Sequence, residues 1–270
     1  MAAGEPRLSV LRLVTIPISH YCEKARWALD RAAIPYHEER HVQGIHQLAA
    51  RRAGGGSTVP VLVTPQESIG ESAQILEWVD RRTEVPARLF GGTREVRREI
   101  GALCTRFDEH LGPAGRRLVY VHMFGGPREL MLRFNDQGVP AWEDRVVRVG
   151  LPVFARFISR VLDIRPGVEQ GDEELVWREF DHAGELLRDG RPFLCGERFS
   201  AADLTFAALA APVLMPPGYG VELPQPDILP EATARLVRRA REHPAGAHAL
   251  RMYAEQRRAA PAPEAVAAAR

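Results

Sequence analysis

Signals typical of β-strands are confined to roughly the first eighty residues of the chain. The apolar runs that predict strands occupy 10–18, 36–42, 59–63 and 66–69. Two helices are expected among them, over 21–33 and from 71 or 72 to 81. The first strand–helix–strand unit implies a parallel pair, and the two short strands after the glycine-rich loop predict a hairpin. The chain therefore begins with a small α/β domain.

After this domain the apolar spacing is helical only. One stripe recurs every three or four positions and consists of Val96, Ile100, Leu103, Cys104, Phe107 and Leu111. Further helices are expected over 128–135, 142–161, 172–188, 201–213 and 232–242. We therefore expect the α/β domain to span 8–83, a Pro- and Gly-rich linker 84–93, an all-helical domain 94–258 and a disordered tail 259–270.

Composition excludes several classes of protein. The net charge of +1 argues against nucleic-acid binding through phosphate contacts. The three cysteines, Cys22, Cys104 and Cys195, lie far apart without the spacing of metal ligands, so no metal site is expected. No signal peptide and no apolar run of membrane-spanning length is recognisable. We therefore expect a reduced cytoplasmic protein with no membrane association.

Two short motifs mark helix starts. Ser19-x-x-Cys22 follows the first strand, so a hydroxyl and a thiol lie at a helix N-terminus, where backbone N–H groups point outward. Such a place favours an anion, and a thiolate is an anion. In the second domain, Ser200 and Asp203 have the spacing of a capping box, so Asp203 is expected to stabilise its own helix start rather than to serve chemistry.

A small α/β domain followed by a helical one, with Ser-x-x-Cys after the first strand, resembles the glutathione S-transferase superfamily. The serine-type classes have a serine followed by a basic residue and a leucine in the first helix, which fall here on Ser19, Arg26 and Leu29. Thr58-Val59-Pro60-Val61-Leu62 is similar to the family's Val-Pro-x-Leu. Gly70-Glu71-Ser72-Ala73-Gln74-Ile75-Leu76 is similar to its Glu-Ser pair, and the capping box is a fourth match.

The resemblance implies a thioredoxin-like N-terminal domain, a helical-bundle C-terminal domain and a site for glutathione between three segments. Ser72 and Glu71 would hold the γ-glutamyl end at a helix N-terminus. Val59, before a cis Pro60, would pair with the cysteinyl backbone. Gln47 or His46 would contact the glycyl carboxylate. A simpler interpretation makes Glu71 and Ser72 helix-capping residues and Pro60 an ordinary trans proline.

Ser19 is the candidate catalytic residue. A free thiol has a pKa of about 8.5, and a hydroxyl that donates a hydrogen bond to sulfur beside a helix N-terminus favours the thiolate. Alternatively, Ser19 only caps the helix. Cys22 is the rival, because the segment also resembles a glutaredoxin Cys-Pro-Tyr-Cys with Ser19 in the first place and His20 in the second. The helix start would then depress the pKa of Cys22. Lys24 and Arg26 are expected on the helix flank as ion-pair partners.

The second substrate would bind between the domains. The candidates for its pocket are Phe107, His110, Leu111, Tyr120, Met123 and Phe124, although a stripe of this kind is more typical of a core. The resemblance implies a transferase for small electrophiles in detoxification, by conjugation, isomerisation or dehalogenation, acting as a homodimer. A glutathione-dependent thiol reductase using Cys22 and a non-catalytic binding module are the alternatives. The thiol could also be another low-molecular-weight thiol.

Overall fold

The computed structural model describes residues 10–84, 87–124, 128–161 and 168–257. Its sheet has the strand order β2-β1-β3-β4. The strands are β1 (Leu11–Thr15), β2 (Tyr36–Arg40), β3 (Val61–Val63) and β4 (Ser68–Ile69). β1 pairs with β2 in parallel and with β3 antiparallel, and β3 and β4 form an antiparallel hairpin. Both the expected parallel pair and the expected hairpin are confirmed.

Helices cover both faces of this sheet. They are α1 (His20–Arg31), α2 (His46–Arg52) and α3 (Ser72–Arg82). Side chains alternate along β1, so Leu13 packs with α1 and α3 while Val14 packs against Ala50 and Ala53 on and just after α2. The domain is thioredoxin-like, as the resemblance implies. The sequence did not predict α2, a helix of seven residues without a side-chain cap.

In the described residues from 94 onward, regular structure is helical, apart from one isolated β-bridge between Phe193 and Gly196. The elements are α4 (Arg94–Arg106), the π-helical turn η2 (Phe107–Leu111), α5 (Gly112–Phe124), α6 (Arg128–Asn135), α7 (Ala141–Val161), α8 (Val168–Leu186), α9 (Ala201–Leu214), α10 (Glu231–Glu242) and α11 (Pro244–Glu255). α5 and α11 were not predicted. The expected tail at 259–270 lies outside the described residues.

Helix α9 lies at the centre of the helical domain and is buried almost along its whole length. Its capping box is present: Ser200 Oγ accepts from the Ala202 N–H, and Asp203 Oδ2 accepts from the Ser200 N–H at 3.0 Å. Asp203 also accepts from the Leu194 N–H at 2.8 Å. The structural interpretation of Asp203 is therefore confirmed.

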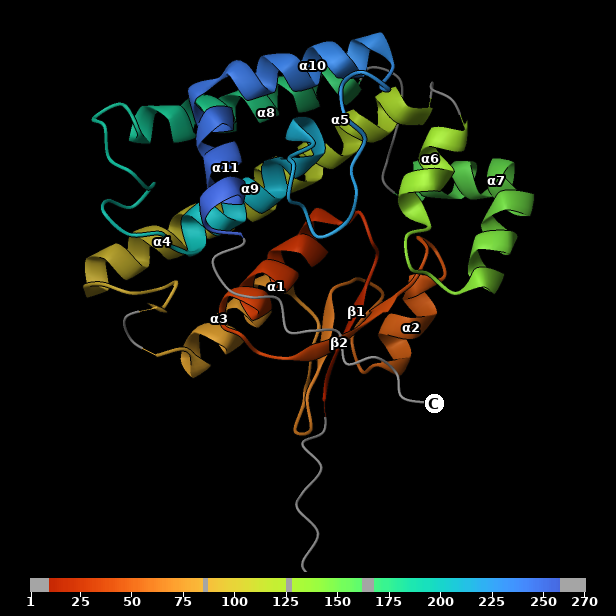
Figure 1. The fold of residues 1–270 in the computed structure, drawn as a ribbon, viewed down its shortest axis with the longest axis horizontal. Coiled ribbons are helices and arrows are strands. Elements are labelled where there is room, and N and C mark those ends of the chain that lie inside the picture. The colour runs from red at the N-terminus through yellow and green to blue at the C-terminus, as the bar shows by residue number, and fades with distance from the viewer. Residues whose placement is uncertain (1–9, 85–86, 125–127, 162–167, 258–270) are drawn as a thin grey trace, which may run out of the picture.

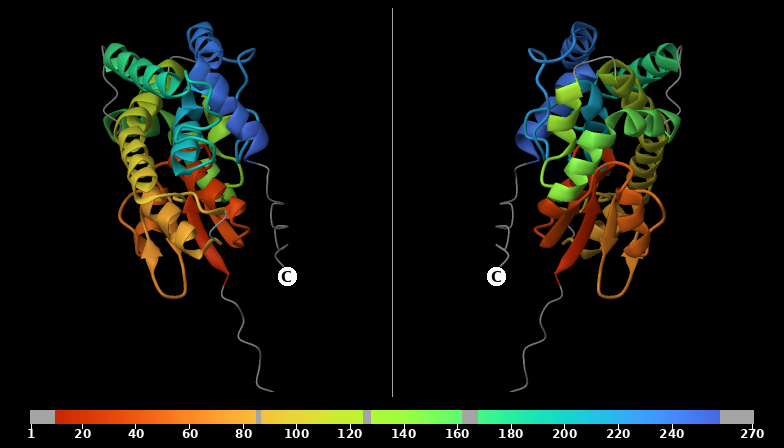
Figure 2. Two further views of the ribbon diagram at one scale, coloured as in Figure 1. Left: turned by 90° about the vertical axis from the view of Figure 1, so that its left-hand side faces the viewer. Right: turned by 90° about the vertical axis from the view of Figure 1, so that its right-hand side faces the viewer.

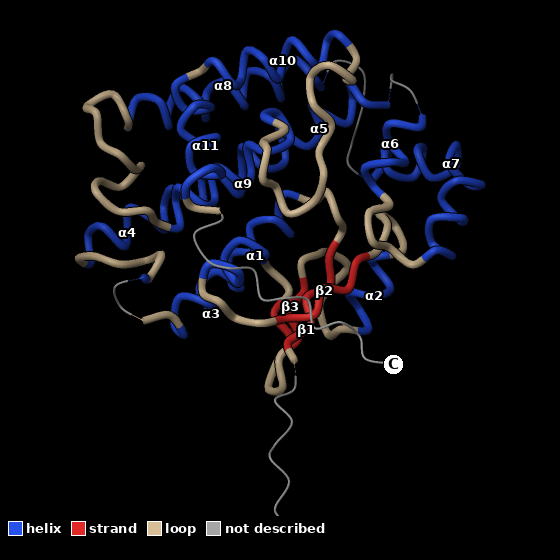
Figure 3. Tube along the Cα trace, viewed as in Figure 1, coloured by secondary structure: helices blue, strands red, loops and turns tan. Residues whose placement is uncertain are grey.

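The two domains share one hydrophobic core. Helix α1 lies between the sheet and α9, and its Trp27 stacks on Phe199 and contacts Tyr253. Figure 1 and the side views of Figure 2 show the helical domain resting on α1. Figure 3 shows how small the strand region is compared with the helical part. None of the described helices is long and apolar enough to cross a membrane.

Helices α6 and α7 lie apart from the main bundle and beside α2 (Figure 1). Glu143 of α7 accepts from the Val42 N–H at 2.9 Å and contacts His41 Nδ1 at 2.6 Å. Val42 and Val147 form the centre of a small apolar cluster there. These contacts fix the loop that follows β2, and α6 contributes Phe134 and Asn135 to the wall of the pocket between the domains.

Candidate active site

Strand register brings three predicted segments to one edge of the sheet. Val14 of β1 pairs with Val61 of β3, and Leu62 pairs with Ile69 of β4. The loop after β1, the start of β3 and the chain after β4 therefore meet at the same edge. These stretches carry Ser19, Val59–Pro60 and Glu71–Ser72.

Ser19 is the N-cap of α1. Its Oγ accepts from the Cys22 N–H at 3.4 Å, and the side chain is half-buried. An N-cap oxygen satisfies one of the unpaired N–H groups at the helix start, and the hydroxyl keeps one proton of its own that it can donate. Ser19 is therefore placed to donate a hydrogen bond to an anion beside the positive end of the α1 dipole.

Cys22 lies in the first turn of α1 and is fully buried. Burial raises the pKa of its thiol to about 11, and the nearby Arg26 and the hydrogen bond to Ser19 offset only part of this. The expectation of a depressed pKa is therefore wrong, because desolvation by burial outweighs the groups that favour the thiolate. A protonated, buried thiol is typical of a structural cysteine.

The other predicted glutathione contacts lie on the same edge. The Val59–Pro60 peptide bond is cis, as the resemblance implies. Ser72 is the first residue of α3 and is buried, whereas Glu71 is exposed and makes no side-chain cap bond. Because the Glu71 side chain does not cap the N-terminus of α3, the first N–H groups of this helix remain available to a carboxylate.

His46 and Gln47 begin α2 at the far end of this edge. His46 is buried, its Nδ1 accepts from the Gly44 N–H at 2.9 Å, and burial lowers its pKa to about 4. That nitrogen is thus engaged in holding its own loop. Gln47 is partly exposed, so it is the more accessible of the two candidates.

A pocket lies between the domains and opens beside Ser19. Its space measures about 860 Å³, the solvent-open mouth included. It is lined by Ile16, Ile18, Ser19, His20, Gln43, Arg116, Val119, Tyr120, Phe134, Asn135, Ala211, Pro212, Met215, Tyr219, Leu223 and Pro224. An apolar cavity with a few polar groups is the usual form of a small-molecule site.

Of the residues predicted for this pocket, Tyr120 lines it and donates to Gln43 Oε1 at 2.7 Å. Phe107 and Leu111 instead lie fully buried in the core, where Phe107 packs against Phe206. His110 is half-exposed on another face, with Nδ1 3.4 Å from Glu179 Oε1. The π-helical turn rotates these three residues relative to α5. The side chains of Met123 and Phe124 lie outside the described residues.

Residues 13–87 match the family model of the glutathione S-transferase N-terminal domain. This stretch contains all three converging segments. This match identifies 13–87 as a domain of the glutathione S-transferase N-terminal type.

Solved structures of glutathione S-transferases have the same two-domain fold. The enzyme from Xanthobacter autotrophicus has a TM-score of 0.59 at 14% identity, covering 94% of this chain and 95% of that one. The glutathione-bound protein from Methylobacillus flagellatus has a TM-score of 0.58 at 17% identity, covering 92% and 96%. A possible transferase from Rhodopseudomonas palustris has a TM-score of 0.54 at 14% identity, covering 92% and 95%. No curated protein matches the chain.

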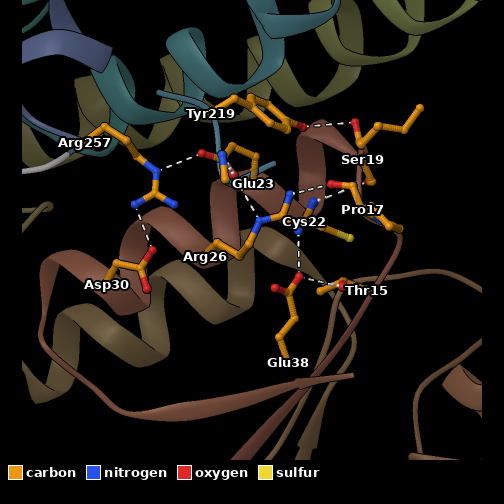
Figure 4. Close-up of polar contacts among 12 residues, drawn as sticks. Thr15, Pro17, Ser19, Cys22, Glu23, Arg26, Asp30, Glu38, Tyr219 and Arg257 are labelled. Carbon is orange, nitrogen blue, oxygen red and sulfur yellow. Dashed lines mark hydrogen bonds and ion pairs between the residues drawn. The ribbon is translucent and has the colours of Figure 1, made fainter. Parts of the chain in front are cut away.

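A buried ion-pair network supports the loop that carries Ser19 (Figure 4). Arg26 donates to Glu23 Oε2 at 3.0 Å, to Glu38 Oε1 at 2.7 Å and to the Pro17 carbonyl at 2.8 Å. The hydroxyl of Tyr219 donates to the Ile18 carbonyl at 3.0 Å. The two carbonyls that precede Ser19 are thus held from both domains.

Arg26 and Lys24 do form ion pairs, as expected, but both are buried rather than on an exposed flank. Lys24 Nζ contacts both carboxylate oxygens of Asp108, at 2.8 and 2.7 Å. Asp108 lies in the π-helical turn, so this pair joins α1 to the helical domain. The sequence alone suggests that this flank of α1 faces solvent, but the helical domain covers it.

Three pocket residues of this transferase-fold protein were missed: Gln43, Arg116 and Tyr219. Arg116 lies on α5, whose glycines and proline mask its helical pattern. Tyr219 lies in a loop without periodicity, so no local signal identifies it. Gln43 lies three residues before the predicted polar pair at the start of α2, in the same loop. Within the described residues, no cluster of His, Cys, Asp and Glu could hold a metal.

Proposed function

We propose that this protein is a glutathione transferase that activates the thiol of glutathione for attack on a small electrophile. The observation that carries the proposal is the position of Ser19. It caps the N-terminus of α1, and it also lines the pocket between the domains. A thiol held beside it would therefore face a second substrate in that pocket.

Ser19 would donate its hydroxyl proton in a hydrogen bond to the glutathione sulfur and stabilise the thiolate. The thiolate would then attack the electrophilic carbon and form a C–S bond. In a substitution, the C–X bond breaks and X leaves as an anion. In an addition to an activated carbon–carbon double bond, the π electrons of that bond move onto the neighbouring carbon, which then takes a proton from water. Val59, Glu71, Ser72 and Gln47 would bind the peptide.

Ser19→Ala tests this role. We expect the pKa of enzyme-bound glutathione to rise by about one to two units, and kcat/KM at neutral pH to fall roughly a hundredfold. The thiolate absorbance of bound glutathione, followed against pH, measures the pKa directly. Because only the ionised thiol attacks, activity of the variant should recover as the pH rises. Ser19→Thr keeps a hydroxyl and should restore much of the activity.

Cys22→Ala is the matched control, since it changes the other candidate in the same turn. The burial of Cys22 supports conjugation over a thiol reductase. If Cys22→Ala lost disulfide reduction while Ser19→Ala kept it at the wild-type rate, the reductase would be favoured instead. If neither variant differs from a wild type that binds glutathione without turnover, the chain is a binding module.

The identity of the thiol needs a separate measurement. A ligand that binds only the native state raises the unfolding midpoint, so thermal-shift titrations with glutathione and other low-molecular-weight thiols compare their affinities. We expect the largest shift with glutathione. A homodimer and a cytoplasmic role in detoxification remain proposals from the family, and light scattering in solution checks the first.

A further inference from the structure

Arg116 is the one side chain with a permanent charge among the described residues that line the inter-domain pocket. The rest of the lining is mostly aliphatic or aromatic, with a few neutral polar groups. The potential inside such an apolar pocket is therefore positive, because low-dielectric walls screen the guanidinium poorly.

Among the described residues, no carboxylate forms an ion pair with the guanidinium of Arg116, and its Nε is buried without a hydrogen-bond partner. Its neighbour Arg117 differs, since its Nε lies 2.8 Å from Asp172 Oδ2 on the side of α8. Desolvating an unpaired cation costs free energy, and a site that tolerates this cost is a candidate for anion binding.

A second unsatisfied polar atom lies on the same pocket wall. His20 is 3% exposed, and its Nε2 has no hydrogen-bond partner within the described chain. Burial, together with the charge of Arg116, lowers its pKa to about 3, while a bond to the Gly112 backbone opposes them. The ring is therefore neutral, so it adds an acceptor to the pocket and no charge.

We propose that the second substrate is an electrophile with an apolar body and a carboxylate, and that Arg116 binds this carboxylate. The proposal rests on the transferase function proposed above. Ser19 and Arg116 lie on α1 and α5 and face one pocket, so a substrate anchored at Arg116 is held with its body along the apolar wall towards the thiol. The Nε2 of His20 is an acceptor, so it would bond to a water held with the ligand and not to the carboxylate itself.

Ethacrynate and its methyl ester form a matched pair of probes. Both have an apolar dichlorophenyl body and the same enone, to whose terminal carbon a thiolate adds while the adjacent carbon takes a proton from water. They differ in the carboxylate, which is remote from the reacting carbon. We expect wild type to favour ethacrynate over the ester in kcat/KM by about tenfold, mainly through KM.

Arg116→Gln should abolish this preference, lowering kcat/KM for ethacrynate about tenfold and leaving the ester nearly unchanged. Arg97→Gln is the control, because Arg97 is exposed on α4 and away from the pocket. An unchanged preference in Arg116→Gln would overturn the proposal. So would an equal rise in KM for glutathione with both probes, since Arg116 would then bind the thiol peptide.

Binding of the saturated, unreactive analogue of ethacrynate separates the two hypotheses. Calorimetric titration should show tighter binding to wild type than to Arg116→Gln, whether or not the protein turns over. Binding that depends on Arg116 without any turnover would keep the anion site and reject the transferase. Turnover of the ester with carboxylate-independent binding would keep the transferase and reject the anion site.

Discussion

Two regions around helix α1 treat buried charge in opposite ways. Along its flank, Glu23 and Arg26 are almost fully buried, and their charged atoms meet partners from three parts of the chain (Figure 4). At its N-terminal end, His20 and Arg116 present polar atoms that find no partner in the described structure.

The paired charges of the flank stabilise the fold, whereas the unpaired groups at the pocket end are available for binding. A paired network in a low-dielectric interior fixes geometry, because breaking one pair leaves the other charge stranded. Unpaired groups beside a cavity contribute nothing to the empty fold and are available to a ligand. The flank would therefore hold the Ser19 loop in place, and the pocket end would take the substrate.

The largest effect on stability is expected from Arg26→Met. This change removes the cation that Glu23 and Glu38 share, and it leaves the Pro17 carbonyl without its donor. Breaking a buried ion pair from one side costs about 3–5 kcal/mol. Urea unfolding should show a loss of this size.

Arg12→Met is the control for that measurement. Arg12 also pairs with a glutamate on β2, Glu39, but both side chains are about a third or more exposed. Exposed pairs contribute about 0–1 kcal/mol. Equal losses in the two variants would mean that burial does not distinguish the flank from the surface.

The acid limb of the stability curve tests Glu38. Burial alone would raise the pKa of Glu38, but Arg26 and Arg40 outweigh it and hold the value at about 2, against an ordinary 4.5. Since the folded pKa is depressed, the contribution is complete above pH 4.5 and is lost as the pH falls towards 2. We expect the stability gap between wild type and Glu38→Gln to narrow by about 3 kcal/mol across this window. A constant gap would contradict the role of Arg26.

The sequence predicted the segments that form the edge of the sheet better than the pocket. Ser19, Val59–Pro60 and Ser72 lie at strand ends or helix starts, and local patterns mark such places. The short helix α2 was missed, because Ala50 and Ala53 are too small to give a strong apolar face.

The pocket depends on long-range contacts that leave no local pattern. The π-helical turn shifts the helical register after Arg106, so the stripe through Phe107 and Leu111 continues into the core rather than into the cavity. Asp172 pairs with Arg117 and leaves Arg116 unpaired, and nothing in the sequence around these adjacent arginines distinguishes them. Burial of Lys24 likewise follows only from the docking of the helical domain.

Arg257→Gln should have an intermediate effect. Arg257 follows α11, and it contacts Glu23 Oε1 and Asp30 Oδ2, each at 2.8 Å. Hydrogen bonds between charged groups contribute about 2 kcal/mol when partly buried. A urea titration should show a loss of about this size, and the exposed Arg238→Gln on α10 should show almost none. If the two losses were alike, the C-terminal end of the flank network would not contribute to stability.

The smallest effect, and the one of opposite sign, is expected from Arg116→Met. A methionine of similar length removes a partly buried cation whose Nε has no partner in the described chain, so the free energy of unfolding should stay unchanged or rise by up to about 1 kcal/mol. Urea unfolding without ligand measures this, with Arg26→Met as the opposite case. A loss above about 1 kcal/mol would show that Arg116 stabilises the empty fold, and the contrast between the flank and the pocket end would fail. A small gain in stability together with lost binding of the saturated ethacrynate analogue is the combination expected of a group kept for a ligand.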